Sequence, residues 1–207
     1  EIIRRRIDPD GTKEPVIQRQ GADRVLVQLP GVDDPEEIKR LLGRTAKLTF
    51  QLVDTSITAQ EVRQRGRAPS GSVLLPADDD SSEAFVVEKR VMVSGELLES
   101  AQASFDQNNR PAVTFALNAE GAKKFGRVTG ANIGRPFAII LDGKVVSAPT
   151  IQSQIFGNGQ ITGNFTVTET NELALILRAG ALPAPLIVME ERSVGPGLGA
   201  DSVAAGQ

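Results

Sequence analysis

The sequence predicts an α+β fold with two subdomains: a ferredoxin-like base built from residues 1–54 and 163–194, and an α+β head inserted at residues 55–162. Three observations carry this prediction. First, strand-like alternation of apolar and polar residues and capped amphipathic helices occur near both ends of the chain. Second, a helix that ends at a glycine precedes the last apolar run. Between these ends the composition changes abruptly, which is typical of an inserted unit.

The first part of the base contains a hairpin, a helix and a strand. Residues 15–20 and 24–31 alternate apolar and polar side chains around a Gly-Ala-Asp turn, which predicts a hairpin with one face on a core. Asp34 is an N-cap for a helix that ends at Gly43, because an Asp-Pro start and a Gly stop are typical helix boundaries. Residues 46–54 return as a strand.

The second part of the base is a helix followed by a strand. Residues 166–179 place Leu173, Ile176 and Leu177 on one face, and Gly180 follows the end of this helix. The apolar run at residues 184–194 predicts the last strand. With the first part, these elements suit a two-layer sandwich of the ferredoxin-like type.

The first half of the head is dominated by a long connection. Residues 55–83 are rich in Arg, Ser, Pro and Asp with little periodicity, so we expect a connection with one short strand. Residues 95–105 then form a helix candidate with Ser94 as its cap.

The second half of the head shows clearer local signals. Residues 111–117 predict a strand, and residues 118–129 predict a helix capped by Asn118. Asp142-Gly143 lies between two β-branched runs, which is a strong hairpin signal, and a further tight glycine turn follows at residues 155–163.

Composition excludes most common chemistry. The 207-residue chain has no Cys and no His, which removes thiolate nucleophiles, Cys/His zinc sites and imidazole bases. The net charge is −3, so the chain lacks the excess of basic residues that attracts nucleic-acid phosphates, and we expect no nucleic-acid partner. No apolar stretch is long enough to span a bilayer, and the first residue is Glu, so the chain reads as an excised piece.

The closing glycines pose the sharpest question about a ligand. Gly195-x-Gly197-x-x-Ala200 follows an apolar run as a dinucleotide-binding turn would, but only seven residues follow Ala200. A dinucleotide site needs a helix, a second strand and a ribose-binding acidic residue after the glycines. We therefore interpret residues 195–207 as a linker and expect no nucleotide cofactor.

Two charged stretches are candidate ligand sites. The acidic run at residues 78–83 offers oxygen ligands without the spacing of a calcium loop, so we expect solvated acids and no metal. A short basic segment that could contact anionic lipid headgroups contains Arg63, Arg65 and Arg67, although a solvated linker is the simpler interpretation. Lys144 is expected beside a turn, where a lysine is typically solvated, so we expect a structural role rather than a Schiff-base lysine.

Several longer stretches resemble one known family. The matching segments are EIIRRRID, EPVIQRQGADRVLVQLPGVDDP, LDGKVVSAPTIQSQIFGNGQITGNF, LRAGALPAPL and ERSVGPGLGADSV. Together they resemble the large extracytoplasmic domain of the SecD family of bacterial protein-export subunits. Residues 56–84 show nothing distinctive of that family.

The resemblance implies a translocation aid rather than an enzyme. It implies a domain on the periplasmic side of the bacterial inner membrane, attached through flanking helices, with SecF, the SecYEG channel and unfolded preprotein as partners. A preprotein-binding head needs an adaptable apolar surface. Apolar residues of the head that could supply it are Phe105, Phe115, Phe125, Phe137, Ile155 and Phe156, and a core position is the competing interpretation for each.

The resemblance also implies that head and base move relative to each other. The chain would cross between them at two places, and hinge motion usually concentrates in a few such residues. The candidate hinge residues are Asp54, Thr55, Ser56, Thr162, Gly163 and Asn164. Two other hypotheses stay open: a scaffold that holds SecF and the channel in register, and a nucleotide or metal enzyme.

Overall fold

The computed structural model describes residues 1–32, 34–78 and 82–192. Their helices are α1 (Ile2–Ile7), α2 (Pro35–Gly43), α3 (Ala59–Arg65), α4 (Ala119–Ala131) and α5 (Val167–Ala179), with one 3₁₀ turn at Gly95–Leu97. Their strands are β1 (Val16–Gln20), β2 (Arg24–Gln28), β3 (Leu48–Leu52), β4 (Ser72–Pro76), β5 (Ala84–Glu88), β6 (Val93–Ser94), β7 (Leu98–Phe105), β8 (Pro111–Leu117), β9 (Phe137–Leu141), β10 (Lys144–Ser147) and β11 (Asn158–Thr162). The predicted α+β class is confirmed.

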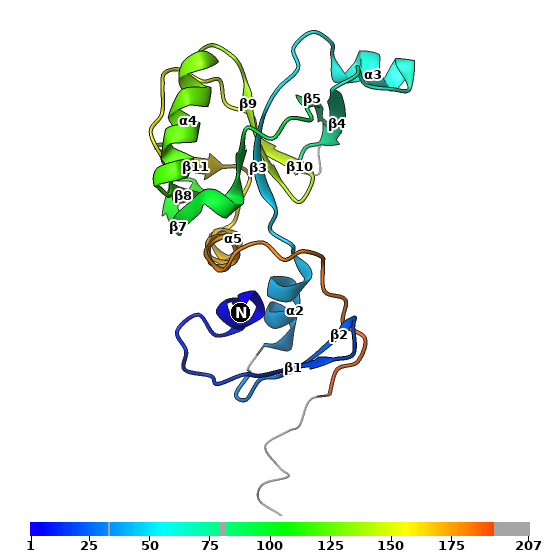
Figure 1. Cartoon of the computed structure of the whole chain (residues 1–207), viewed down its shortest axis with the longest axis vertical. Coiled ribbons are helices and arrows are strands. Elements are labelled where there is room, and N and C mark those ends of the chain that lie inside the picture. The colour runs from blue at the N-terminus through cyan, green and yellow to red at the C-terminus, as the bar shows by residue number, and fades with distance from the viewer. Residues whose placement is uncertain (33, 79–81, 193–207) are drawn as a thin grey trace, which may run out of the picture.

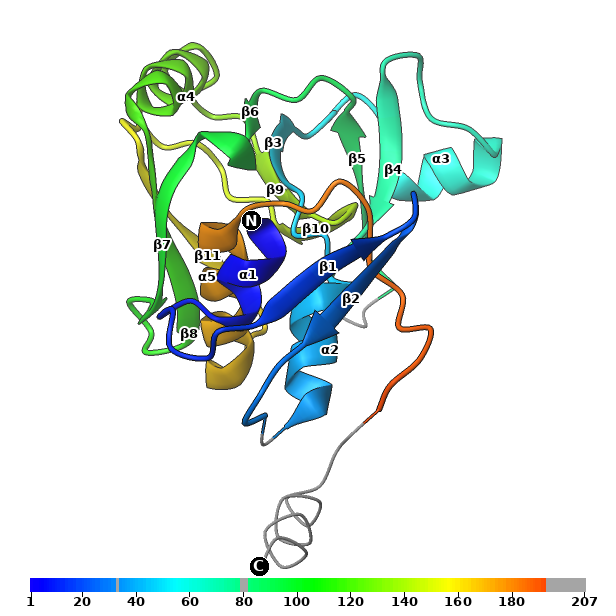
Figure 2. The ribbon, with the colours of Figure 1, turned by 60° about the horizontal axis from the view of Figure 1, so that its bottom comes forward.

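The elements gather into two bodies (Figure 1). We call residues 1–43 the N-terminal body; it holds α1, α2 and the β1–β2 hairpin. We call residues 48–179 the sheet body; it holds all the other elements. Helix α5 lies on the side of the sheet body that faces the N-terminal body, where α1 packs against it (Figures 1 and 2).

The core of the sheet body lies between two antiparallel sheets. One sheet has the order β10-β9-β3-β6, and the other has the order β11-β8-β7. Phe50 on β3 is the centre of an aromatic cluster, with ring centroids 5.4 Å from Phe115, 5.4 Å from Phe125 and 5.9 Å from Phe137. Each of these four rings is at most 4% exposed, so the cluster is a packed core.

The β4–β5 hairpin is linked to the first sheet by isolated bridges at two places. Val53, just past β3, bridges to Val87 on β5, while Ala77, just past β4, bridges to Val145 on β10. The side chains enclosed by these strands form a second small core around Val87 and Ile140. Helix α3 covers the outer face of the hairpin through Val62.

Local sequence signals account for most element boundaries. Asp34 accepts hydrogen bonds from the backbone N–H groups of Glu36 and Glu37, as the predicted N-cap should. Asn118 caps α4 by accepting from Gly121 N at 2.8 Å. The Asp142-Gly143 turn joins β9 to β10 with positive φ at both residues, which is the geometry this dipeptide favours.

Three predicted elements are wrong. Residues 98–105 are strand β7 rather than a helix, because they pair with β8 along its whole length and Ser94 caps only the 3₁₀ turn. Residues 59–65 are helix α3, although a connection is predicted there. No element is predicted for residues 2–7, which form helix α1. The last strand does not form over residues 184–192.

The packing also differs from the expected division into base and head. Strand β3 is expected in the base, but it pairs with β9 inside the sheet body. Helix α5 is expected there too, but Leu173, Ile176 and Leu177 pack into the core of the sheet body, against β7 and β8. The β1–β2 hairpin pairs only with itself among the described strands, and Val16 and Val25 on it are exposed. Burial therefore groups residues 48–179 together, and Leu41 of α2 joins the same core.

Candidate functional site

Two short segments lie where the N-terminal body meets the sheet body. Residues 44–47 lead from α2 into β3, and residues 180–182 leave α5. The N–H of Leu182 donates to the carbonyl of Thr45 at 2.9 Å, so the two segments lie side by side. We call residues 44–47 and 180–182 the waist.

Arg6 ties both segments of the waist to α1. Helix α1 buries Arg6 and Ile7 on the face that contacts α2 and α5, and Arg6 is completely buried. Its guanidinium donates to four backbone carbonyls, those of Leu41 (2.8 Å), Arg44, Thr45 (2.9 Å) and Gly180 (3.0 Å). A planar guanidinium can bind carbonyls that diverge in this way, which a single ammonium nitrogen cannot do.

The electrostatics of Arg6 reflect its position. Burial lowers the pKa of Arg6, and the charge of Asp142 opposes this effect. The Nε of Arg6 is buried and has no hydrogen-bond partner among the described residues, while each terminal nitrogen donates to two carbonyls. Removing this side chain would take the Arg6 donor from the part-buried carbonyls of Arg44 and Gly180, one in each waist segment, whereas the Thr45 carbonyl would keep the N–H of Leu182.

Asp142 also holds the first waist segment in place. The β9–β10 turn presents its carboxylate to residues 45–47, where it accepts from Ala46 N (3.0 Å), Lys47 N (2.8 Å) and the Thr45 hydroxyl. The Asp142 N–H donates back to the Lys47 carbonyl at 3.1 Å. The turn that joins β9 to β10 is thus also the anchor of the first waist segment.

Each waist segment contains one residue with left-handed backbone geometry. Ala46 has φ +58° and is buried, which is unfavourable for a residue with a Cβ atom, and Asp142 holds it by its N–H. Gly180 has φ +95°, which favours glycine, and directly follows α5. The chain therefore turns sharply at both segments.

Among the described residues, one ion pair crosses between the bodies beside the waist. Arg40 on α2 and Glu172 on α5 are 3.2 Å apart, with side-chain exposures of 50% and 13%. A pair at this exposure contributes at most about 1 kcal/mol. The two bodies are thus joined by the hydrogen bonds at the waist, by this partly exposed ion pair, by the packing of α1 against α5 and by the contact of Leu41 with the core.

The structure places the expected hinge residues inside the sheet body. Asp54 accepts from Ser56 and Ser72, and its N–H donates to Val86 on β5. The hydrogen bond from the Ser56 hydroxyl, followed by that from Ser72, lowers the pKa of Asp54. Thr162 pairs with Ala112 in the β11–β8 ladder.

Rotation at these positions would break pairing within one packed body. Thr55 and Ser56 form the turn after Asp54, and Gly163 and Asn164 form the bend that ends β11. We therefore find no boundary between bodies at either expected hinge.

The expected preprotein-binding residues do not form one surface. Phe115, Phe125 and Phe137 belong to the buried aromatic cluster and cannot contact a ligand from outside. Phe105 and Phe156 are exposed by 55% and 69%, and Ile155 is half-buried. These three residues remain candidates.

The two exposed phenylalanines lie toward opposite ends of one sheet. Phe105 pairs with Pro111 at the start of β8, whereas Phe156 precedes the strand whose Asn158 pairs with Ala116. Pro111 and Ala116 are roughly 17 Å apart along an extended strand. A ligand that touches both residues must be an extended segment.

Sequence reasoning missed Arg6 and the anchoring role of Asp142. Arg6 is the last of three consecutive arginines, and such a run normally predicts side chains that are exposed to solvent. A usable signal was helical spacing, because Ile2 lies four residues before Arg6 and Ile3 lies four before Ile7, which puts Arg6 on an apolar face. Its four acceptors are 35 to 174 residues away, so no local pattern could identify them.

Some predicted features lie outside the described residues. These are the glycine motif at Gly195, Gly197 and Ala200, the linker at residues 195–207, and residues 79–81 of the acidic run. Within the part of the chain that the structure describes, no helix combines the length and apolar character needed to cross a bilayer.

Two family models match the chain, one on each side of residues 56–71. Residues 1–55 match the N-terminal part of the P1 domain of protein translocase subunit SecDF. Residues 72–184 match the P1 head subdomain of SecDF, a match that includes α5. The chain belongs to the SecD family. The predicted resemblance is confirmed, and the chain corresponds to the P1 domain of SecD.

Individual SecD relatives agree with the family models. Protein translocase subunit SecD of Rickettsia conorii is 51% identical over 210 residues, which cover 100% of this chain and 40% of the relative. The SecD of Rhodobacter capsulatus is 48% identical, and the match covers 37% of its length. This chain thus spans about 40% of the length of the curated SecD relatives that it matches.

Solved SecDF structures share the fold. A structure of SecDF, a membrane component that enhances protein export, is 36% identical with a TM-score of 0.73, covering 93% of this chain and 90% of that one. A crystal structure of SecDF in a super-membrane-facing form is 37% identical with a TM-score of 0.76, covering 99% of this chain and 29% of that one. This chain is therefore part of a protein-translocase subunit.

Proposed function

We propose that this chain is the periplasmic, non-catalytic part of a SecD subunit, in which a head captures emerging preprotein and swings on a base to aid export driven by the proton motive force. The proposed base is the N-terminal body, and the proposed head is the sheet body. The proposed partners are SecF, the SecYEG channel and unfolded preprotein, and the proposed location is the periplasmic side of the inner membrane.

The waist is the single observation that carries this proposal. Two chain crossings lie side by side, and each contains a residue with positive φ. Bodies joined in this way tend to move relative to each other, and a few residues at element ends absorb the change in dihedral angles. The rotation we propose therefore occurs at residues 44–47 and 180–182 rather than at Asp54 or Gly163.

Preprotein capture rests on the three accessible candidates, Phe105, Ile155 and Phe156. Unfolded segments share backbone and hydrophobicity but no sequence, so exposed apolar side chains at separate points suit them. Phe156 packs across the face of α4 at Gly126, where an added Cβ atom would come within 2.9 Å of its ring. The ring is therefore held in place although it is exposed.

The second candidate function, a rigid scaffold for SecF and the channel, is favoured by the hydrogen bonds at the waist. Arg6 makes four of them, and Asp142 exchanges four more with residues 45–47. A scaffold would keep these contacts throughout export. A swinging head must release part of them.

Locking the waist distinguishes the two functions. This chain contains no Cys, so Arg40→Cys and Glu172→Cys in the full-length protein place one thiol on each body within the chain. A short bis-thiosulfonate reagent links the two thiols and is released by reductant. We expect the linked protein to lose export stimulation in membrane vesicles and to regain it on reduction, because the link prevents rotation.

A matched pair within one body provides the control. Ser104 on β7 and Thr114 on β8 share a hydrogen bond of 2.8 Å, so a link between Ser104→Cys and Thr114→Cys does not cross the waist. This control, and each single Cys variant, should keep full export activity with the reagent. If the protein with the fully linked Cys pair at positions 40 and 172 kept undiminished export activity, that result would favour the scaffold function.

A further inference from the structure

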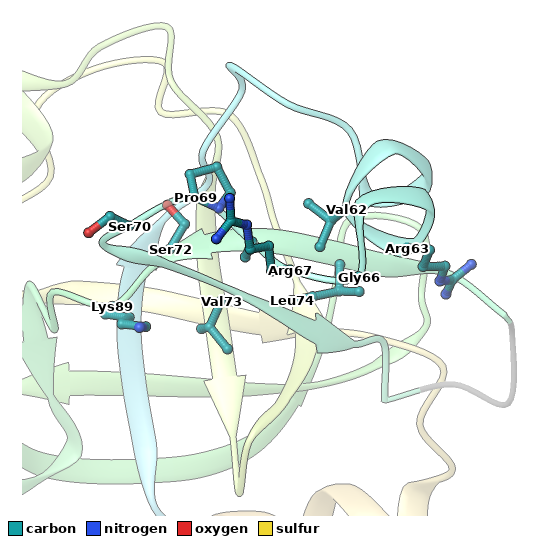
Figure 3. A pocket seen from close by; sticks show the side chains of 11 residues that line it. Val62, Arg63, Gly66, Arg67, Pro69, Ser70, Ser72, Val73, Leu74 and Lys89 are labelled. Atoms are coloured by element: carbon teal, nitrogen blue, oxygen red, sulfur yellow. The ribbon is translucent and has the colours of Figure 1, made fainter.

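A groove runs between α3 and β4 on the outer face of the sheet body. It has a volume of about 510 Å³, within the size range of pockets that hold ligands (Figure 3). Its walls are α3, the loop at residues 66–71 that follows α3, and β4. Most of this wall lies at residues 56–71, between the two segments that match SecDF family models.

Local chemistry holds α3 and its loop in place. Thr58 and Glu61 form a reciprocal capping box at the start of α3, and Gly66 ends the helix in left-handed geometry with φ +70°. The N–H of Ser72 then donates to the Pro69 carbonyl, which turns the chain into β4. The groove is thus bounded by ordered backbone.

The floor of the groove is apolar. Val62 on α3 is only 4% exposed and packs in a small cluster with partly buried Ala68 and Leu74. The Ser72 hydroxyl, also at this wall, donates to Asp54 at 2.6 Å and is not available to a ligand. The floor therefore suits an aliphatic side chain.

The rim of the groove is cationic. Arg67 extends over the groove from the loop, and Lys89 lies at the far side of β4 (Figure 3). Both side chains are exposed, and neither forms a salt bridge with any described carboxylate.

Nearby carboxylates are occupied elsewhere. Glu61 accepts from the backbone and hydroxyl of Thr58, and Glu88 pairs with Arg135 at 2.6 Å. The rim therefore carries two cations, Arg67 and Lys89, that form no salt bridge with a described carboxylate.

We propose that the α3–β4 groove binds an extended acidic peptide segment, with an aliphatic side chain on the floor at Val62 and Leu74 and flanking carboxylates at Arg67 and Lys89. Charge complementarity selects an acidic partner, and the recessed floor selects a chain that can insert a side chain. A flat anionic membrane would reach the rim but not the floor. This inference does not depend on movement at the waist.

Direct binding to the 207-residue chain tests the inference. The probe is a fluorescein-labelled nonapeptide in which Glu alternates with Val and Leu, and binding is followed by fluorescence anisotropy. We expect saturable binding that weakens about tenfold in the variant Arg67→Ala with Lys89→Ala, as the loss of two exposed ion pairs would produce. Peptides with Lys in place of Glu, or with Ser in place of Val and Leu, should bind more weakly than the probe.

A matched variant controls for overall charge. Lys124→Ala with Arg127→Ala removes the same two residue types from the exposed face of α4, away from the groove, and should change affinity less than twofold. Equal losses in the two variants, or no saturable binding by the wild-type chain, would overturn the inference. So would binding to phosphatidylglycerol vesicles that depends on Arg67 and Lys89 without any binding of the peptide.

Discussion

Arg6→Gln is expected to lower the free energy of unfolding by about 3 kcal/mol, because it removes the donor to the buried carbonyl of Leu41 and to part-buried carbonyls in both waist segments. The loss should be concentrated in the N-terminal body, since α1 is fastened through this side chain. Urea denaturation should then show a first transition at lower urea, and hydrogen exchange should accelerate in α1 and α2.

The neighbouring Arg5 provides the control for this prediction. Its side chain is 60% exposed and, among the described residues, pairs only with Glu1, so Arg5→Gln should change stability by less than about 0.5 kcal/mol. Arg6→Lys should be intermediate, because one ammonium cannot reach all four carbonyls. Equal losses for the Arg5 and Arg6 variants would show that the four bonds contribute little.

Phe50→Ala is expected to cost about 4 kcal/mol, the usual range for a buried phenylalanine. Phe50 is 1% exposed and contacts the rings of Phe115, Phe125 and Phe137, which come from both sheets and α4. The cavity would lie where these elements meet, so the whole sheet body should lose stability together. The measurement is urea denaturation followed by circular dichroism.

Phe156→Ala is the matched comparison within the same body. Its ring is 69% exposed, so little apolar area is uncovered and the loss should stay below about 1 kcal/mol. If Phe156→Ala destabilised as much as Phe50→Ala, the assignment of one ring to the core and the other to the surface would be wrong.

Predictions from the sequence succeeded where the determinant is local. The caps at Asp34 and Asn118 and the Asp142-Gly143 turn depend on residues within a few positions of each other, and all three form as predicted. The helix at 167–179 also forms, and a capping box of Thr166 and Glu169 starts it.

Predictions failed where distant pairing decides. The segment after Ser94 has helix-favouring Leu, Glu and Ala, but pairing of Ala101 with Phe115 and of Ala103 with Val113 makes it a strand. Thr58 and Glu61 carried a capping-box signal for α3 that the polar surroundings obscured. The division into bodies depends on which core α5 packs against. The apolar face of α5 alone does not specify that core.

The candidate site was the least predictable part. Three of the six apolar candidates were core residues, because aromatic side chains at regular spacing serve a core as readily as a surface. The waist depends on contacts between α1, residues 44–47, the β9–β10 turn and the end of α5, which are far apart in the sequence.

If head and base move about the waist, the distance between the two bodies varies, and a distance distribution between them measures this variation. Spin labels at Asp23→Cys in the β1–β2 turn and Lys124→Cys on α4 report the distance between bodies in full-length protein in membranes. A second pair, Gln107→Cys with Lys124→Cys, lies within the sheet body and serves as the reference.

We expect at least two distances for the pair at residues 23 and 124, with populations that shift when a proton motive force is applied, while the reference pair keeps one narrow distance. One narrow distance at residues 23 and 124 that does not change with the proton motive force would contradict movement about the waist and leave the scaffold as the function.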